Sequence, residues 1–83
     1  MKPEKTLERV QSGSRNIRFD DFVRLIEAYG FVLDRISGSH HIFSNPRVPQ
    51  SISAQPDKNG KAKPYQTHQF MALVKKYSLV LEE

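Results

Sequence analysis

Two consecutive histidines are the residues of this chain whose side chains are best suited to catalysis. They lie in the segment from Ser37 to Asn45, where a glycine and a serine come directly before His40 and His41. Imidazole has an unperturbed pKa of about 6.5, so it exchanges a proton near neutral pH without a cofactor. A histidine held at the start of a strand is therefore a candidate acid or base. The alternative interpretation is a polar residue on the surface of a strand.

The alternation of side chains along a strand separates the two histidines. His40 shares a face with Ile42, whereas His41 shares the opposite face with Phe43. The two imidazoles therefore do not act as a pair. If Phe43 is the core residue, His41 packs near it and His40 faces solvent, but the reverse assignment fits the periodicity as well.

The chain lacks the residues that several other common kinds of catalytic site require. There is no cysteine, which excludes disulfides, thiol nucleophiles and thiolate metal ligands. His68 is the only further histidine and no carboxylate cluster accompanies it, so we expect neither a metal nor a cofactor. Ser39 precedes His40 and points to the other face, so we expect no Ser-His-acid triad.

Length and charge point to an extended anionic partner. The 83 residues form one domain with a small core, which favours a target that lies across the surface. Thirteen Lys and Arg against nine Asp and Glu give a net charge of +4, and this favours nucleic acid first. No apolar run approaches the ~18 residues of a membrane span. We therefore expect a cytoplasmic protein with no membrane partner.

A second polar cluster extends from Lys58 to Gln66 and contains three lysines that run into a predicted helix start. Free amide hydrogens and the helix dipole favour an anion there, and Lys61 and Lys63 add positive charge. The cluster therefore predicts a phosphate contact, with a solvated loop as the alternative.

Apolar periodicity predicts the elements that position these side chains. One helix begins at Phe19 and ends at Gly30, and another begins near Pro64 with the same i, i+3, i+4, i+7 pattern. Three strand-like runs lie between them, at residues 31–36, 39–44 and, more weakly, 50–55. The first two form a hairpin. The pattern predicts an α+β fold of two layers, in which a three-stranded antiparallel sheet carries both helices on one face in the order α-β-β-β-α.

The first 18 residues read differently from the rest of the chain. Residues 3–11 favour a short helix with a thin apolar stripe, and residues 15–18 read as an irregular connector. We therefore divide the chain into an N-terminal extension, residues 1–18, and a domain, residues 19–83.

The order of elements and the motif Gly38, Ser39, His40 and Phe43 resemble the HicA toxins of type II toxin–antitoxin pairs. These are small mRNA-cleaving ribonucleases with a fold similar to a double-stranded-RNA-binding domain (dsRBD-like), and the resemblance spans residues 19–79. It implies that His40 is catalytic, that Gly38 and Ser39 lie beside the RNA, and that a HicB antitoxin blocks the site. The N-terminal extension and the long lysine loop depart from the family pattern.

We therefore expect a metal-independent endoribonuclease that cleaves mRNA, in which His40 moves a proton and the two lysines of the loop hold phosphates. His41, Tyr65 and His68 are candidates for the second proton-transfer group. Two alternatives stay open: a non-catalytic RNA-binding module, and an inactive toxin-like subunit that only binds an antitoxin. A sequence-specific DNA reader ranks lower, because strands separate the two strong helices.

Overall fold

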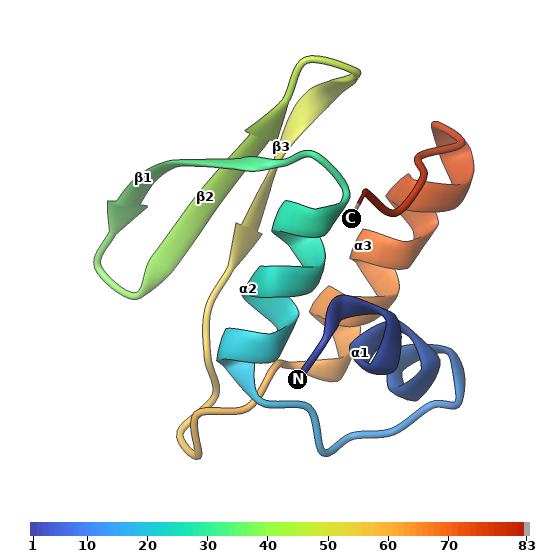
Figure 1. Cartoon of the computed structure of the whole chain (residues 1–83). Helices are drawn as coiled ribbons and strands as arrows, with labels where there is room; N and C mark the ends of the chain where they lie inside the picture. Colours follow the sequence, from blue (N-terminus) through green and yellow to red (C-terminus); the bar gives the residue numbers. More distant parts are fainter. Residues whose placement is uncertain (83) are drawn as a thin grey trace.

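The computed structural model describes residues 1–82, and Figure 1 shows the course of the chain. Three helices and three strands follow in the order α1 (Pro3–Gln11), α2 (Phe19–Ala28), β1 (Val32–Ser37), β2 (His40–Asn45), β3 (Val48–Ala54) and α3 (Pro64–Lys76). From α2 onward this is the predicted order α-β-β-β-α. The predicted short N-terminal helix is present as α1.

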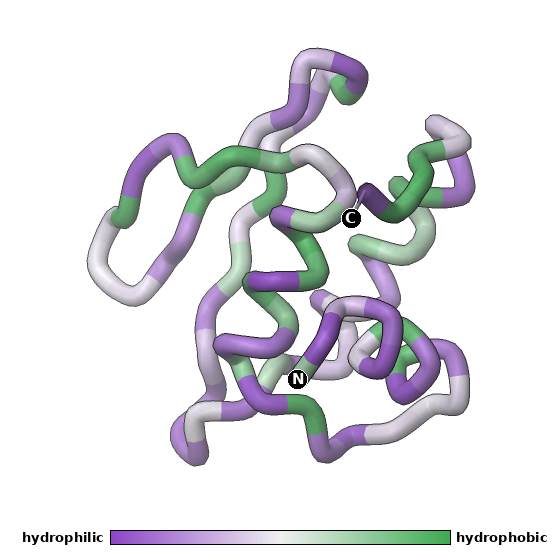
Figure 2. The backbone as a smooth tube through the Cα atoms, in the orientation of Figure 1, coloured by the Kyte–Doolittle hydropathy of each residue, from purple (hydrophilic) through white to green (hydrophobic). Residues whose placement is uncertain are grey.

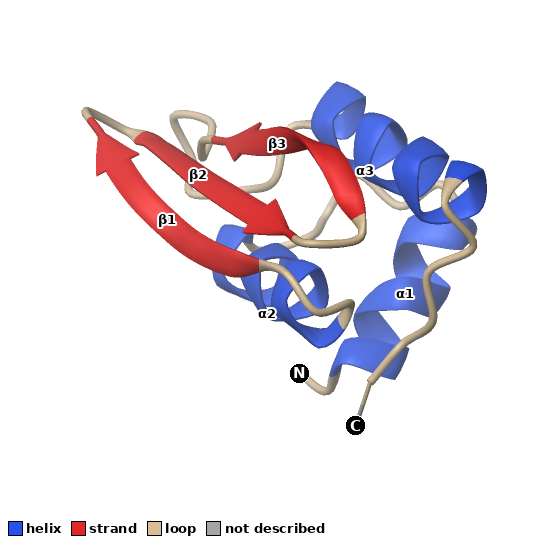
Figure 3. Ribbon diagram, turned by 90° about the horizontal axis from the view of Figure 1, so that it is seen from above, coloured by secondary structure: helices blue, strands red, loops and turns tan. Residues whose placement is uncertain are grey.

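The sheet is antiparallel with the strand order β1-β2-β3, so β1 and β3 are its two edges. Seen from above in Figure 3, the strands form one layer, with α2 beneath them and α3 alongside β3. The predicted α+β class is therefore confirmed. No helix among residues 1–82 is long and apolar enough to cross a bilayer.

The core lies between the sheet and the two long helices. Figure 2 shows apolar and polar stretches alternating along α2, as expected for a helix with one buried side. The Phe70 side chain on α3 is 1% exposed, and its ring meets three other aromatic rings edge-on, with centroids 5.6–5.8 Å apart: Phe22, Tyr29 and Phe31. Burial also raises the pKa of the Tyr29 phenol. Phe43 closes this core from the sheet side, with no exposed surface.

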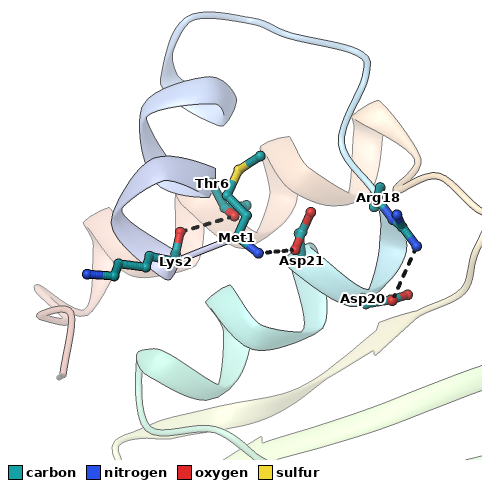
Figure 4. A network of polar contacts seen from close by, with 6 residues as sticks. All are labelled: Met1, Lys2, Thr6, Arg18, Asp20 and Asp21. Atoms are coloured by element: carbon teal, nitrogen blue, oxygen red, sulfur yellow. Dashed lines mark hydrogen bonds and ion pairs between the residues drawn. The ribbon is translucent and has the colours of Figure 1, made fainter.

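The N-terminal segment packs on α2, and α1 lies on the side of α2 away from the sheet (Figures 1 and 3). Thr6 and Val10 of α1 are buried, and the amino group of Met1 lies 3.3 Å from Oδ1 of Asp21 (Figure 4). Burial of one helix face against α2 accounts for the order of α1, whose own apolar stripe is thin. The division of the chain at residue 18 stays a prediction.

The connector between α1 and α2 is more regular than its composition suggests. Ile17 is 3% exposed, and its carbonyl oxygen accepts a hydrogen bond of 2.8 Å from the backbone N–H of Ala62. Arg18 and Lys61 form an isolated antiparallel bridge beside it. These contacts join segments more than 40 residues apart, so local sequence carries little sign of them.

The junction between α2 and β1 needs a glycine. Gly30 has φ +90°, and a Cβ at this position would lie 2.9 Å from Oε2 of Glu82 and 3.4 Å from Nδ2 of Asn45. The buried Asn45 side chain donates from Nδ2 to the carbonyl of Tyr29, 3.1 Å away. The end of β2 is thereby tied to the end of α2.

The third strand is longer than its weak signal predicts. It begins at Val48 instead of residue 50 and includes Pro49. An edge strand accommodates proline because one side of its backbone needs no partner. Ile52 and Ala54 are buried on the helix-facing side of the sheet, as the alternation predicts.

Candidate active site

The turn between β1 and β2 places His40 at the start of a strand. Ser37 pairs with His40, so Gly38 and Ser39 form a two-residue loop. Gly38 has φ +62°, and nothing lies within 4 Å of an added Cβ. The backbone conformation is therefore what requires glycine, as in hairpin turns whose first loop residue has positive φ. The sheet fixes the His40 backbone while its side chain remains exposed.

The two histidines point to opposite faces of the sheet. Phe43 is fully buried, so His41, which shares its face, is directed toward the helices, and this decides between the two assignments that periodicity left open. His40 lies on the outer face with Ile42. Its Nδ1 is 3.3 Å from Oγ of Ser53, which belongs to the neighbouring strand β3 and pairs with Ile42.

The contacts of the His41 side chain indicate a structural role. Its ring meets the ring of Phe19 edge-on, with centroids 5.0 Å apart and an interplanar angle of 64°. Its Nδ1 lies 3.2 Å from the carbonyl oxygen of Ser39. A carbonyl only accepts, so Nδ1 carries the hydrogen and, in the neutral ring, Nε2 keeps the lone pair.

A β-bulge in β1 adds an arginine to the outer face. Leu33 pairs with Phe43 and Arg35 pairs with Ile42, so β1 has one extra residue, Asp34, between the two pairs. Without the bulge, Leu33 and Arg35 would share a face. With it, Arg35 joins the face of His40. Its guanidinium lies 2.8 Å from the carboxylate of Asp34.

The lysine-rich loop after β3 is folded around one carboxylate. Oδ1 of Asp57 accepts hydrogen bonds from the backbone N–H groups of Lys61, at 2.9 Å, and Asn59, at 2.8 Å. These two donors hold the pKa of the Asp57 carboxyl below its usual value, with smaller help from the charges of Lys61 and Lys63. The loop is therefore a structured turn, and its residues 58–60 are exposed, so both the phosphate contact and the solvated loop stay open.

Contacts with the N-terminal connector fix the position of this loop. Nζ of Lys61 donates to Oδ1 of Asn16 at 2.5 Å, and the backbone N–H of Phe19 donates to the carbonyl of Gly60 at 3.0 Å. The ring of Phe19 is the one that His41 touches. The loop therefore lies beneath the end of the sheet where β2 begins, on the helix side, whereas His40 faces outward.

The start of α3 offers fewer free amides than its sequence suggests. Pro64 has no N–H, and the backbone amides of Gln66 and Thr67 donate to the carbonyl of Lys63 at 2.9 and 3.2 Å. Lys63 is the residue that precedes the helix, and its side chain makes no capping hydrogen bond. Any anion held here would therefore depend mainly on the lysine side chains.

Comparison with known proteins places this arrangement in a family. The sequence model described as "HicA toxin of bacterial toxin-antitoxin" matches residues 19–73, from the first residue of α2 into α3. The chain belongs to the HicA toxin family. Comparisons with curated proteins and with solved structures give no match. The matched region of this HicA chain contains the whole sheet and the lysine loop.

Sequence reasoning missed two residues of the HicA outer face, Ser53 and Arg35. The pattern of β3 alternates Ser51 and Ser53 with the buried Ile52 and Ala54, which would have put both serines on the outside. Only the register with β2 shows that Ser53 meets His40. The bulge that turns Arg35 outward has no such local signature.

Metal ligands are not gathered at this site. Among residues 1–82 of the HicA chain, no group of three or more His, Cys, Asp or Glu side chains has the geometry to hold an ion. His68 is exposed on α3, and the sheet keeps His40 and His41 on opposite faces.

Proposed function

We propose that this chain is the toxin of a type II toxin–antitoxin pair and acts as a metal-independent endoribonuclease on mRNA, with His40 as its single catalytic histidine. The observation that carries the proposal is the exposed His40 ring on a rigid strand, with Nδ1 against Ser53, in a chain of the HicA family. A histidine placed in this way can reach a polymer that lies across the sheet.

RNA supplies its own nucleophile, so one well-placed proton acceptor promotes its cleavage. His40 removes the proton of a ribose 2′-hydroxyl while the 2′-oxygen bonds to the adjacent phosphorus. The bond from phosphorus to the 5′-oxygen then breaks, and that oxygen takes up a proton. The products are a 2′,3′-cyclic phosphate and a 5′-hydroxyl. Such proton transfer contributes typically ~10² to 10⁴ in rate.

The surroundings of His40 supply contacts for the phosphate backbone. The turn residues Gly38 and Ser39 are exposed directly beside it, so their backbone can approach the RNA. Lys61 and Lys63 follow β3 in the loop below this end of the sheet, and we assign them to phosphates further along the strand. His41 faces the helices, which argues against it as the second proton-transfer group.

A HicB-like antitoxin is the proposed protein partner. To block cleavage, it has to cover the outer face around His40, where the imidazole is accessible. We also propose that the toxin acts in the cytoplasm, because its proposed substrate is mRNA.

Cleavage by the purified chain tests the enzyme. Wild type, His40→Ala and Ser44→Ala are incubated with an mRNA and with an RNA carrying 2′-deoxyribose at the cleaved position. Ser44 is an exposed residue of the same strand and serves as the matched control. We expect wild type and Ser44→Ala to cleave ribose-containing RNA only, with unchanged rates in EDTA. His40→Ala should lose at least about 10²-fold.

The other outcomes identify the alternatives. Equal RNA binding without cleavage by wild type and His40→Ala would indicate a non-catalytic RNA-binding module. Neither cleavage nor salt-dependent RNA affinity would indicate a toxin-like subunit that only binds its antitoxin. Complete inhibition by EDTA would exclude the metal-free scheme.

A further inference from the structure

A groove of about 430 Å³ lies between the edge strand β3 and helix α3. Ile52 and Phe70 form part of its apolar floor, and the side chains of Gln50 and Gln69 line it from the two elements. Its size lies in the lower part of the range of small-molecule sites, about 300–1,000 Å³. The groove is therefore large enough for a base with its ribose.

The groove shares one residue with the surroundings of the proposed catalytic histidine. Ser53 is among the residues that line it, and the hydroxyl oxygen of Ser53 lies 3.3 Å from Nδ1 of His40. β3 is an edge strand, so a chain that leaves His40 on the β3 side would reach the groove at Ser53.

The lining of the groove suits a nucleotide. Amide side chains, here Gln50 and Gln69, offer a donor and an acceptor together, as the edges of bases do. Lys76 lines the groove from the last turn of α3, and none of the described lining residues is acidic. The groove thus combines base-reading groups with one cation for a phosphate.

We propose that this groove holds the single-stranded RNA next to the scissile phosphate, with its glutamine amides on base edges and Lys76 on a phosphate. The inference rests on the proposed function, because the RNA enters from His40. An extended peptide that adds a strand to the free edge of β3 is the competing occupant. The contact of the lining residue Ser53 with His40 and the positive, acid-free lining favour RNA.

Binding of an uncleavable RNA tests the groove independently of catalysis. A fluorescein-labelled hexanucleotide with 2′-O-methyl groups lacks the 2′-hydroxyl nucleophile, so its affinity reports binding alone. The variants are Lys76→Glu and Lys75→Glu, which make the same charge change at neighbouring exposed positions of α3. Lys76 lines the groove and Lys75 does not.

We expect Lys76→Glu to weaken binding at least about 10-fold and Lys75→Glu no more than about 3-fold, because only one of them loses a direct phosphate contact. The slope of log affinity against log salt concentration should lose about 0.7 more of its magnitude in Lys76→Glu than in Lys75→Glu. This is the contribution of one phosphate contact to the slope for a single strand. In NMR spectra, the side-chain amide signals of Gln50 and Gln69 should shift on addition of the hexanucleotide. Those of Gln11, exposed on α1, should stay in place.

Equal losses of RNA affinity in the two lysine variants, together with unshifted amide signals of Gln50 and Gln69, would overturn the proposal. An extended peptide would then be the remaining candidate occupant of the groove. The two proposals fail separately. If wild type cleaves RNA while Lys76→Glu and Lys75→Glu bind alike, the nuclease stands and the groove is wrong. If His40→Ala cleaves as well as wild type while Lys76→Glu alone loses affinity, the catalytic assignment is wrong and the groove stands.

Discussion

The ring of His41 stands edge-on against the ring of Phe19, with 5.0 Å between their centroids, and this contact ties the histidine motif to the first residue of α2. Aromatic pairs of this kind contribute about 0.5–1.5 kcal/mol beyond the area that they bury. His40, one residue earlier, is exposed, and its ring forms none of the aromatic pairs found among residues 1–82. The two histidines should therefore differ in their effect on stability.

Urea unfolding of wild type, His41→Ala, Phe19→Leu and the double variant measures this contact. We expect His41→Ala to lower the free energy of unfolding by about 1 kcal/mol more in wild type than in the Phe19→Leu background. His40→Ala is the matched control and should change it by less than about 0.5 kcal/mol. An identical loss from His41→Ala in both backgrounds would show that the two rings are not coupled.

Arg35 is expected to contribute to RNA cleavage through the bulge at Asp34. The bulge places its guanidinium on the face of His40, where it can bind the phosphate that is cleaved. We expect Arg35→Ala to lower kcat/KM for RNA by about 10-fold and to reduce the salt dependence of binding. Arg24→Ala removes the same charge from an exposed site on α2 and is the control.

Deletion of Asp34 tests the geometric half of this argument. Without the extra residue Arg35 follows Leu33 directly, so the β1 register becomes regular and Arg35 stays opposite Ile42 on the outer face. Cleavage should then stay close to that of wild type, while circular dichroism retains the α+β spectrum. A loss in the folded deletion variant as large as in Arg35→Ala would contradict this register, and equal losses in the Arg35 and Arg24 variants would remove Arg35 from the site.

Sequence periodicity captures the elements that bury a continuous stripe. The apolar stripes of α2 and α3 and the alternating residues around Phe43 pack against the core. Burial therefore sets which of their positions are apolar. The short helix α1 was also predicted. The start of β3 was placed two residues late, because Pro49 reads as a break unless the strand is known to be an edge.

Sequence periodicity predicts less of the candidate active site than of the fold. His40 was found because its motif is local, and the outward direction of its side chain followed once Phe43 was known to be buried. Ser53 is set by strand register and Arg35 by a bulge, and both depend on pairing between strands. The bridge of Arg18 with Lys61 likewise joins distant segments. Such non-local contacts leave no periodic signal in the chain.

Asp57 should make the stability of the lysine loop depend on pH in the acid range. Its carboxylate accepts the backbone N–H groups of Lys61 and Asn59, and these hydrogen bonds hold its pKa below the ordinary value of 3.8. The unfolded chain therefore takes up this proton at a higher pH than the folded chain. The stabilisation is fully present above the ordinary value, and it is lost as the pH falls from there through the lowered pKa of the folded protein.

We therefore expect Asp57→Ala to unfold at a lower temperature than wild type at pH 7, with a difference that is constant down to about pH 5 and shrinks below about pH 4. Thermal unfolding followed by circular dichroism between pH 2 and pH 7 measures it. Glu27→Ala removes an exposed carboxylate of α2 outside the loop and is the control. A difference between wild type and Asp57→Ala that is unchanged down to pH 2 would mean that the ionised carboxylate does not stabilise the loop, because only the charged form gains from both backbone donors.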